Sequence, residues 1–82
     1  MPKIQIYTKD YCPYCTKAKE TMKREGWEFT EIDITREPGA FEELKARSSH
    51  MTVPQIFIGD TFIGGSDDLD AKIEEVREMM KV

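Results

Sequence analysis

The sequence contains few of the residues from which metal sites and disulfide frameworks are built. Its 82 residues include two cysteines, Cys12 and Cys15, and a single histidine, His50. A structural zinc or iron–sulfur site usually takes its ligands from two Cys-x-x-Cys pairs, or from one pair and histidines. One chain cannot complete such a set from Cys and His alone, so we expect no metal to be bound within the monomer. His50 lies in the polar stretch RSSHM and is predicted to be an exposed loop residue.

The chain also lacks long apolar runs and an excess of positive charge. No segment approaches the ~20 apolar residues of a membrane span. The N-terminus, MPKIQIYTKD, has neither the apolar run nor the small-residue cleavage site of a secretory signal. The formal net charge is −4, and Lys and Arg are interspersed with acids, which gives no electrostatic footprint for nucleic acid. We therefore expect a cytoplasmic protein with neither a membrane nor a nucleic acid as partner.

The composition that remains is typical of a small globular domain. Hydrophobic residues make up 39% of the chain and charged residues 34%. Enough apolar surface is therefore available to offset the entropy of the chain, which makes disorder a poor interpretation. A chain of this length corresponds to one domain with one modest core, and we expect residues 1–82 to form that domain.

The first elements can be read from apolar periodicity and from helix-terminal residues. Ile4–Tyr7 alternate between apolar and polar residues and predict a strand. Pro13 suits the first turn of a helix, so the first helix is predicted to begin essentially at Cys12. Gly26 is a suitable residue to end that helix. The cysteine pair is thus predicted to lie between the first strand and the first helix.

Residues 27–34 predict a second strand whose apolar pattern changes phase. Trp27 and Phe29 have one parity, and Ile32 and Ile34 have the other. A bend in the strand would explain this change. An edge strand with both faces partly covered would explain it equally well.

The second half of the chain predicts a helix, a hairpin and a last helix. The helix should run from residue 38 to about residue 47, with Phe41 and Leu44 facing the core. Two apolar runs, at residues 54–58 and 61–63, flank Gly59 and Asp60 and predict a tight hairpin.

Gly64 and Gly65 should end the last strand, and Ser66 should then cap the third helix. Apolar residues at helical spacing form the stripe of that helix, namely Leu69, Ile73, Val76 and Met80. The element order is β-α-β-α-β-β-α. It predicts an α/β fold with a mixed four-stranded sheet flanked by three helices.

The motif YCPYCTK has three possible uses: half of a metal site, a structural bridge or a redox-active dithiol. Ligand counting removes the first use within one chain. A static bridge is rare in a reducing compartment, and closing so short a loop adds little stability. Cys12, at a helix start, lies where free N–H groups and the helix dipole favour a thiolate, and Lys9 adds a positive charge nearby. Cys15, one turn later, is placed to resolve a mixed disulfide on Cys12.

Three motifs together establish a resemblance to a known family. CPYC follows YTK, TVP spans residues 52–54, and GGSDD spans residues 64–68. With these motifs in this order, the chain resembles a glutaredoxin of the small bacterial dithiol kind over nearly its whole length. The resemblance implies the thioredoxin fold, which agrees with the βαβαββα order, and it implies glutathione as co-substrate.

By this resemblance, several residues acquire roles at a glutathione site. Pro54 would be a cis-proline that faces the cysteines. Val53 would offer its backbone N–H and C=O to the cysteinyl unit of glutathione, like an added strand, and Thr52 belongs to the same motif. Lys9 and Tyr14 resemble residues that line the site, with Lys9 near a glutathione carboxylate. Taken alone, Pro54 equally fits the start of an edge strand, and the other two side chains fit an exposed surface.

The last motif resembles the part of the family's site that holds the γ-glutamyl end of glutathione. That end carries a carboxylate and an ammonium group. Helix-terminal N–H groups beside Ser66 can bind the first, and the carboxylate of Asp67 can bind the second, with Asp68 assisting. The same three residues also fit a helix cap, and we expect both roles.

One position departs from the family pattern. Relatives often supply a polar or basic side chain of the second helix to the glycine carboxylate of glutathione, and the matching position here is Phe41. That contact is therefore left open by the sequence. Arg36 or Arg47 would be the substitutes.

The resemblance implies a glutathione-dependent thiol–disulfide oxidoreductase that works through Cys12 and Cys15. Its expected partners are glutathione and disulfide-bonded or glutathionylated proteins, and we expect a monomer. Two alternatives are a thioredoxin-like reductant supplied by thioredoxin reductase and an iron–sulfur carrier. In that carrier, two chains each give Cys12 and two glutathiones complete the ligands. GGSDD argues against the first alternative, and Pro13, typical of the catalytic relatives, argues against the second.

Overall fold

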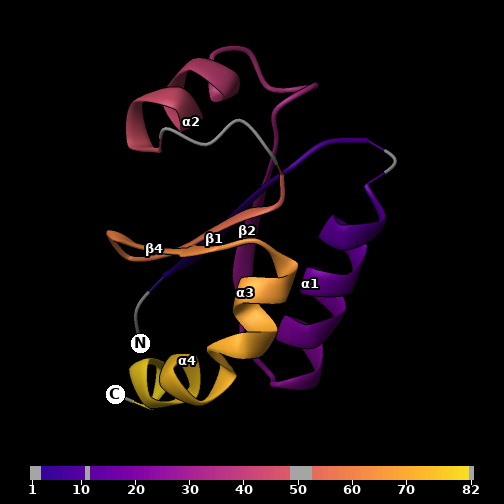
Figure 1. Ribbon diagram of the computed structural model, residues 1–82. Coiled ribbons are helices and arrows are strands. Elements are labelled where there is room, and N and C mark those ends of the chain that lie inside the picture. Colours follow the sequence, from indigo (N-terminus) through magenta and orange to yellow (C-terminus); the bar gives the residue numbers. More distant parts are fainter. Residues whose placement is uncertain (1–2, 11, 49–52, 82) are drawn as a thin grey trace.

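A computed structural model describes residues 3–10, 12–48 and 53–81 of the chain (Figure 1). The strands form one sheet in the order β2-β1-β3-β4, with β1 parallel to β2 and antiparallel to β3, and with β3 antiparallel to β4. The elements are, in order, β1 (Ile4–Thr8), α1 (Pro13–Arg24), β2 (Phe29–Asp33), α2 (Ala40–Arg47), β3 (Gln55–Ile58), β4 (Thr61–Gly64), α3 (Ser66–Ala71) and α4 (Ile73–Met80). The predicted α/β fold with a mixed four-stranded sheet is thereby confirmed.

Helix α1 begins and ends where its terminal residues predict. Cys12 is its N-cap, and Pro13 occupies the first turn, where the missing N–H leaves no helical bond unmade. At the other end Gly26 has a φ of 78°, a conformation that glycine adopts at little cost. The N–H of Gly26 then reaches the carbonyl of Lys23, and the N–H of Trp27 reaches that of Met22. This pair of bonds ends the helix and turns the chain toward β2.

Both faces of the sheet carry apolar side chains. Helices α1, α3 and α4 cover one face, and α2 covers the other (Figure 1). The larger cluster, on the first face, consists of Ile4, Ile6, Ala18, Met22, Ile56, Ile58, Ile63, Leu69, Val76 and Met80. The smaller cluster consists of Tyr7, Leu44 and Phe57. The central strands β1 and β3 are therefore enclosed on both sides.

The change of phase in β2 follows from this arrangement. The strand lies at an edge of the sheet and pairs with β1 without interruption of its register. Trp27 and Phe29 pack against the larger cluster, whereas Ile32 and Ile34 pack against the smaller one. The edge strand with both faces partly covered is thus confirmed, and no bend is needed.

Helix α2 differs from its prediction at its start and in the residues that it buries. It begins at Ala40, after Gly39 with a φ of 81°, and not at residue 38. Ala40 and Leu44 are buried, but Phe41 is 37% exposed and does not face the core as predicted. Residues 40 and 44 lie one turn apart and point at the sheet together, so residue 41 is rotated out of that face. The Phe41 ring instead lies 5.5 Å from the ammonium of Lys45.

The predicted last helix is divided in two. Lys72 has a φ of −105° and a ψ of 16°, and it separates α3 from α4, which runs in a different direction (Figure 1). The predicted stripe is nevertheless kept, because Leu69, Val76 and Met80 all lie in the larger cluster. The described helices are therefore four, not three. None of the helices in the described ranges has both the length and the hydropathy that crossing a bilayer requires.

Candidate active site

The two cysteines lie at the start of α1, immediately beyond the end of β1. Both are free thiols. The backbone N–H of Cys15 donates to Sγ of Cys12, with 3.3 Å between nitrogen and sulfur. The carbonyl of Cys12 accepts the first helical bond, from the N–H of Thr16. The Cys12 sulfur therefore occupies the capping position of the helix, where an N–H group and the positive end of the helix dipole stabilise negative charge.

The environments of the two thiols are unlike. Cys12 is partly exposed, whereas Cys15 is 2% exposed. Burial raises the pKa of the Cys15 thiol to about 12, and its hydrogen bond with Cys12 adds to the increase. Cys15 is therefore protonated at neutral pH in the reduced protein. Of the two, Cys12 is the thiol that a substrate can reach.

The segment before β3 lies against the cysteine pair. The peptide bond between Val53 and Pro54 is cis, as the resemblance implies. The thiol of Cys12 is directed at the carbonyl oxygen of Val53, at 3.9 Å from sulfur to oxygen. Pro54 is buried, and Val53 is partly exposed. A backbone carbonyl thus lies beside the accessible sulfur, although 41 positions separate the two residues in sequence.

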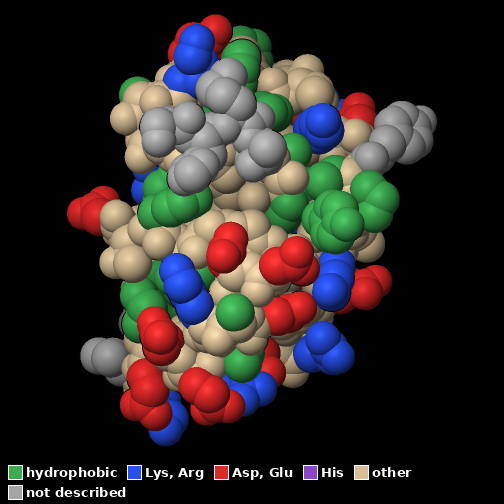
Figure 2. Space-filling view, in the orientation of Figure 1, with side chains coloured by type: hydrophobic (Ala, Val, Ile, Leu, Met, Phe, Trp, Pro, Cys, Tyr) green, Lys and Arg blue, Asp and Glu red, His purple; other side chains and the backbone are tan. Residues whose placement is uncertain are grey.

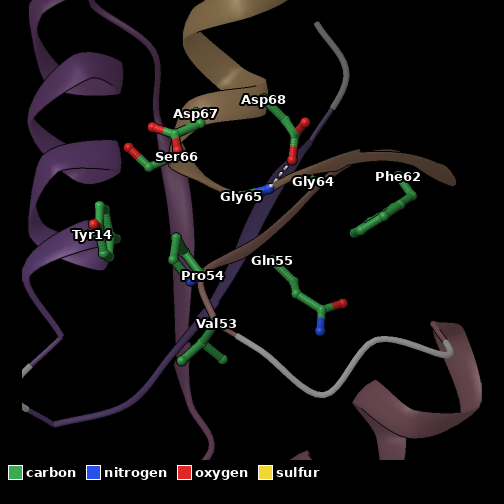
Figure 3. Close-up of a pocket in the computed structure, with 10 residues that line it drawn as sticks. All are labelled: Tyr14, Val53, Pro54, Gln55, Phe62, Gly64, Gly65, Ser66, Asp67 and Asp68. Atoms are coloured by element: carbon green, nitrogen blue, oxygen red, sulfur yellow. Dashed lines mark hydrogen bonds between the residues drawn. The ribbon is translucent and has the colours of Figure 1, made fainter.

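A cavity of about 260 Å³ opens next to this segment (Figure 3). Three parts of the chain contribute to its wall: the first turn of α1, the start of β3 and the junction of β4 with α3. The wall is formed by Tyr14, Val53, Pro54, Gln55, Phe62, Gly64, Gly65, Ser66, Asp67 and Asp68. Six of these ten residues were predicted for the site. Cys12 adjoins the cavity through its contact with Val53.

The start of α3 differs from its prediction. Its N-cap is Gly65, and Ser66 is the first helical residue, so the predicted capping role of Ser66 is wrong. The cap is closed from the other side, because the N–H of Gly65 donates to Oδ2 of Asp68 at 3.0 Å (Figure 3). Asp68 is thereby engaged within the protein, whereas the exposed carboxylate of Asp67 lines the cavity.

The surface around this junction is acidic. Helix α3 carries three exposed carboxylates, on Asp67, Asp68 and Asp70. Figure 2 shows acidic side chains gathered over the region of α3, next to hydrophobic side chains toward α1. Tyr14, in the first turn of α1, is 60% exposed and lines the cavity. A ligand in the cavity would thus meet an aromatic ring and negative charge.

The basic residues considered for the site have different surroundings. Lys9 is exposed and is not part of the cavity wall. Arg47 lies 4.0 Å from the centroid of the Phe57 ring and donates to the Gly59 carbonyl, which holds α2 on the sheet. Arg36 pairs with Asp10 and Asp33 instead.

Phe41 lines a different hollow from the cavity beside Pro54, and Arg36 lines that hollow with it. The structure therefore brings neither Phe41 nor Arg36 to the cavity wall. Two further sequence predictions, for Thr52 in the site and for His50 in an exposed loop, lie outside the described residues.

Four residues of the wall were not predicted: Gln55, Phe62, Gly64 and Gly65. Phe62 belongs to the apolar run predicted for the hairpin; it is 37% exposed, and its ring also contacts Phe57. Gln55 is buried in a strand of otherwise apolar residues. A polar residue at such a position, directly after Pro54, is the signal that could have indicated it. Within the described ranges, no group of three or more Cys, His, Asp or Glu residues is arranged to hold a metal ion.

The chain is similar to proteins of one family over most of its length. The Glutaredoxin family model matches residues 4–63. A glutaredoxin of Pseudomonas aeruginosa is 46% identical over 71 residues, which make up 87% of this chain and 84% of that protein. The solution structure of a glutaredoxin from Brucella melitensis is 43% identical and has a TM-score of 0.81, over 99% of this chain and 90% of the other.

A glutaredoxin–glutathione complex from buckwheat also has a TM-score of 0.81, at 26% identity, over 95% of this chain and 74% of the other. The family model extends from β1 into β4 and includes the cysteine pair at the start of α1, and the two structural matches cover nearly the whole chain. The chain therefore belongs to the glutaredoxin family and is a thiol–disulfide oxidoreductase with the thioredoxin fold.

Proposed function

We propose that the protein uses glutathione to reduce protein–glutathione mixed disulfides and protein disulfides. One observation carries this proposal: the accessible sulfur of Cys12 adjoins a cavity whose wall combines the cis Val53–Pro54 segment with the carboxylate of Asp67. A relative of the same fold from buckwheat is a complex with glutathione. In this proposal the substrates are cytoplasmic proteins, because glutathione keeps most thiols reduced in that compartment.

The first reaction forms a mixed disulfide on the enzyme. The Cys12 thiolate attacks the glutathione sulfur of a glutathionylated protein. The bond between that sulfur and the protein sulfur breaks, and the protein leaves as a thiolate that takes a proton from solvent. A second glutathione then attacks as its thiolate, which releases Cys12 as a thiolate and gives oxidised glutathione. The sum is one mixed disulfide and one glutathione consumed, and one protein thiol and one disulfide formed.

Glutathione binds along the cavity in this proposal. Val53 pairs its backbone with the cysteinyl unit, as an added strand would. Asp67 holds the γ-glutamyl ammonium, Ser66 lies beside the γ-glutamyl carboxylate, and Asp68 supports both by fixing the turn. Tyr14 covers one side of the ligand.

Two further contacts are proposed from the family resemblance, because Lys9 is not among the residues that line the cavity and Thr52 lies outside the described residues. Lys9 faces a glutathione carboxylate from the loop before Cys12, and its ammonium is free to reach the ligand because the side chain is exposed. Thr52 belongs to the same site through its place in the TVP motif. Phe41 makes no polar contact with the glycine carboxylate, so that end of glutathione depends on Lys9.

Protein disulfides follow a second route that needs both thiols. Cys12 attacks one sulfur of the substrate, and Cys15 then attacks Cys12 to close the Cys12–Cys15 disulfide and release the reduced substrate. Glutathione afterwards reduces this disulfide. The buried position of Cys15 fits a thiol that acts only on its neighbour and not on substrates.

The test is a coupled assay of the reduction of a small glutathione mixed disulfide, with glutathione reductase and NADPH. The native protein should show turnover that depends on glutathione, and Cys12→Ser should show none. A parallel assay with thioredoxin reductase in place of glutathione should give no turnover. Activity only in the second assay, or no activity of the native protein in either, would overturn the proposal.

A further inference from the structure

A small polar cluster joins α1 to the strands β1 and β2, and the glutathione site makes no use of it. The cluster joins three elements: Thr8 ends β1, Lys19 belongs to α1, and Glu31 belongs to β2. Nζ of Lys19 lies 3.0 Å from Oε2 of Glu31. The hydroxyl of Thr8 donates to the same oxygen at 2.8 Å. One carboxylate oxygen thus holds both a buried hydroxyl and an ammonium group.

This arrangement fixes the ammonium in place. The Lys19 side chain is only 26% exposed, and Thr8 is 1% exposed. The hydrogen bond from Lys19 lowers the pKa of the Glu31 carboxyl against the opposing effect of its partial burial. Glu31 is therefore charged at neutral pH and holds Lys19 as its counter-ion.

Two observations place the fixed ammonium on the side of α1 that carries the Cys15 thiol. Lys19 follows Cys15 by four residues on α1, and side chains at this spacing are neighbours on one face of a helix. In addition, the backbone N–H of Lys9, next to Thr8 in the chain, acts to lower the pKa of the Cys15 thiol. The thiol therefore lies between the end of β1 and the turn of α1 that carries Lys19. The positive charge of Lys19 opposes the effect of burial on the Cys15 pKa.

We propose that Lys19, positioned by Glu31 and Thr8, stabilises the Cys15 thiolate in the step that closes the Cys12–Cys15 disulfide. This role rests on the dithiol route of the proposed function. The Cys15 thiol gives its proton to solvent, and its thiolate attacks Cys12 of the mixed disulfide. The Cys12 bond to the substrate sulfur breaks, and the substrate leaves as a thiolate that is then protonated. When glutathione later opens the Cys12–Cys15 disulfide, Cys15 departs as the same thiolate, and Lys19 stabilises it again.

Another lysine of the same helix provides a matched control. Lys17 pairs with Asp70 at 3.5 Å, but its side chain is 55% exposed. It lies two residues from Cys15, a spacing at which side chains on a helix do not face each other. Lys17→Met and Lys19→Met thus each remove one salt bridge and one positive charge from α1. Only Lys19→Met removes the charge beside Cys15.

The closing step can be measured without turnover. Cys12 is first glutathionylated, and the release of glutathione as Cys15 closes the disulfide is followed by mass spectrometry. Each unit by which the thiol pKa rises lowers the fraction of thiolate about tenfold. The thiolate that remains is more nucleophilic, which offsets part of this loss, so the rate of attack falls roughly threefold per unit. We expect Lys19→Met to slow the release, by roughly threefold for each unit by which the Cys15 pKa rises. Lys19→Arg should retain most of the native rate, and Lys17→Met should match the native protein.

The same substitutions in the Cys15→Ser background test whether the effect acts through Cys15. There, reduction of the small mixed disulfide uses Cys12 alone, and Lys19→Met should leave its rate unchanged. Equal slowing of this reaction and of disulfide closure, or no slowing of closure, would overturn the role of Lys19. If Lys19→Met does not fold, as judged by circular dichroism, Lys19→Gln replaces it under the same criteria. Failure of the glutathione-dependent function itself would appear separately, as absence of turnover in the native protein.

Discussion

The sulfur of Cys12 accepts a hydrogen bond from the backbone nitrogen of Cys15, and the side chain of Cys15 takes no part in this bond. The α1 backbone therefore supplies a stabilising donor to the Cys12 thiolate that does not depend on the second thiol, which interacts with Cys12 in addition through its side chain. The two cysteines can thus be separated by mutation, because the second can be changed while the first keeps its hydrogen-bond donor.

Cys15→Ser should keep the reduction of glutathione mixed disulfides near the native rate. It should lose the reduction of protein disulfides, because no thiol remains to release the substrate from Cys12. Both activities can be measured on one preparation, with a small mixed disulfide and with a disulfide-bonded protein as substrates. Loss of both activities would show that the assigned roles of the two thiols are wrong.

Asp67→Asn should weaken the binding of glutathione without unfolding the protein. The exposed carboxylate makes no hydrogen bond within the described residues that would be lost, and the substitution removes the charge that holds the γ-glutamyl ammonium. A hydrogen bond to a charged group contributes about 1.5–3 kcal/mol, so KM for glutathione should rise roughly tenfold or more. Asp60→Asn, on the exposed hairpin turn, is the control and should leave KM as it is. Equal values of KM for the two variants would exclude Asp67 from the site.

Gly64→Ala should damage the site more than Gly26→Ala. Both glycines have positive φ, of 121° and 78°, so each substitution introduces backbone strain of about 1–2 kcal/mol. A Cβ at Gly26 would meet open space, whereas a Cβ at Gly64 would lie 2.7 Å from Cβ of Asp68. Asp68 must then move, and its bond to the N–H of Gly65 is lost.

The two glycine variants can be compared by urea unfolding and by KM for glutathione. Gly26→Ala should lose stability alone, and Gly64→Ala should lose more stability and also bind glutathione less tightly. An unchanged KM for Gly64→Ala would mean that the bond between Gly65 and Asp68 does not shape the cavity.

The buried Cys15 thiol should make the stability of the reduced protein depend on alkaline pH. Its pKa is raised from 9.0 to about 12 by folding, so the native state binds this proton more tightly than the unfolded state does. The associated stability is fully present below pH 9 and is lost as the pH rises from there toward 12. The loss is limited to about 1.4 kcal/mol per pH unit.

The measurement is urea unfolding of the reduced protein and of Cys15→Ala at several pH values. Their difference in free energy of unfolding should be constant between pH 7 and 8.5 and should shrink toward pH 10.5, by the linkage of proton binding to folding. Parallel curves over the whole range would show that the thiol titrates alike in the two states.

Local signals in the sequence predicted most of what positions the cysteines. Pro13 marks the start of α1 because a residue without an N–H fits the first turn of a helix. Gly26 marks its end because glycine adopts a positive φ at little cost. The turn at Gly59 and Asp60 likewise predicted the hairpin of β3 and β4. These features depend on neighbouring residues, so a single sequence is enough to find them.

The features that were predicted wrongly depend on contacts between residues distant in sequence, or on patterns that fit more than one structure. The apolar stripe from Leu69 to Met80 keeps helical spacing across Lys72, so periodicity could not reveal the break between α3 and α4. Ser66 is a better capping residue than Gly65 by preference, but Asp68 closes the cap from within the helix. Phe62 lies in an apolar run that predicts a strand but not which residues line a site, and its place on the last strand of the sheet puts it at the cavity.

The position of β2 at the edge of the sheet affects whether two copies of the protein can associate through this strand. An edge strand exposes backbone N–H and C=O groups with which another strand can pair. Glu28 precedes this strand, and Glu31 and Asp33 lie within it. Two such strands brought side by side would set like charges against each other, which is unfavourable in a sheet. The carboxylate that holds Lys19 in place thus also acts against aggregation through this edge.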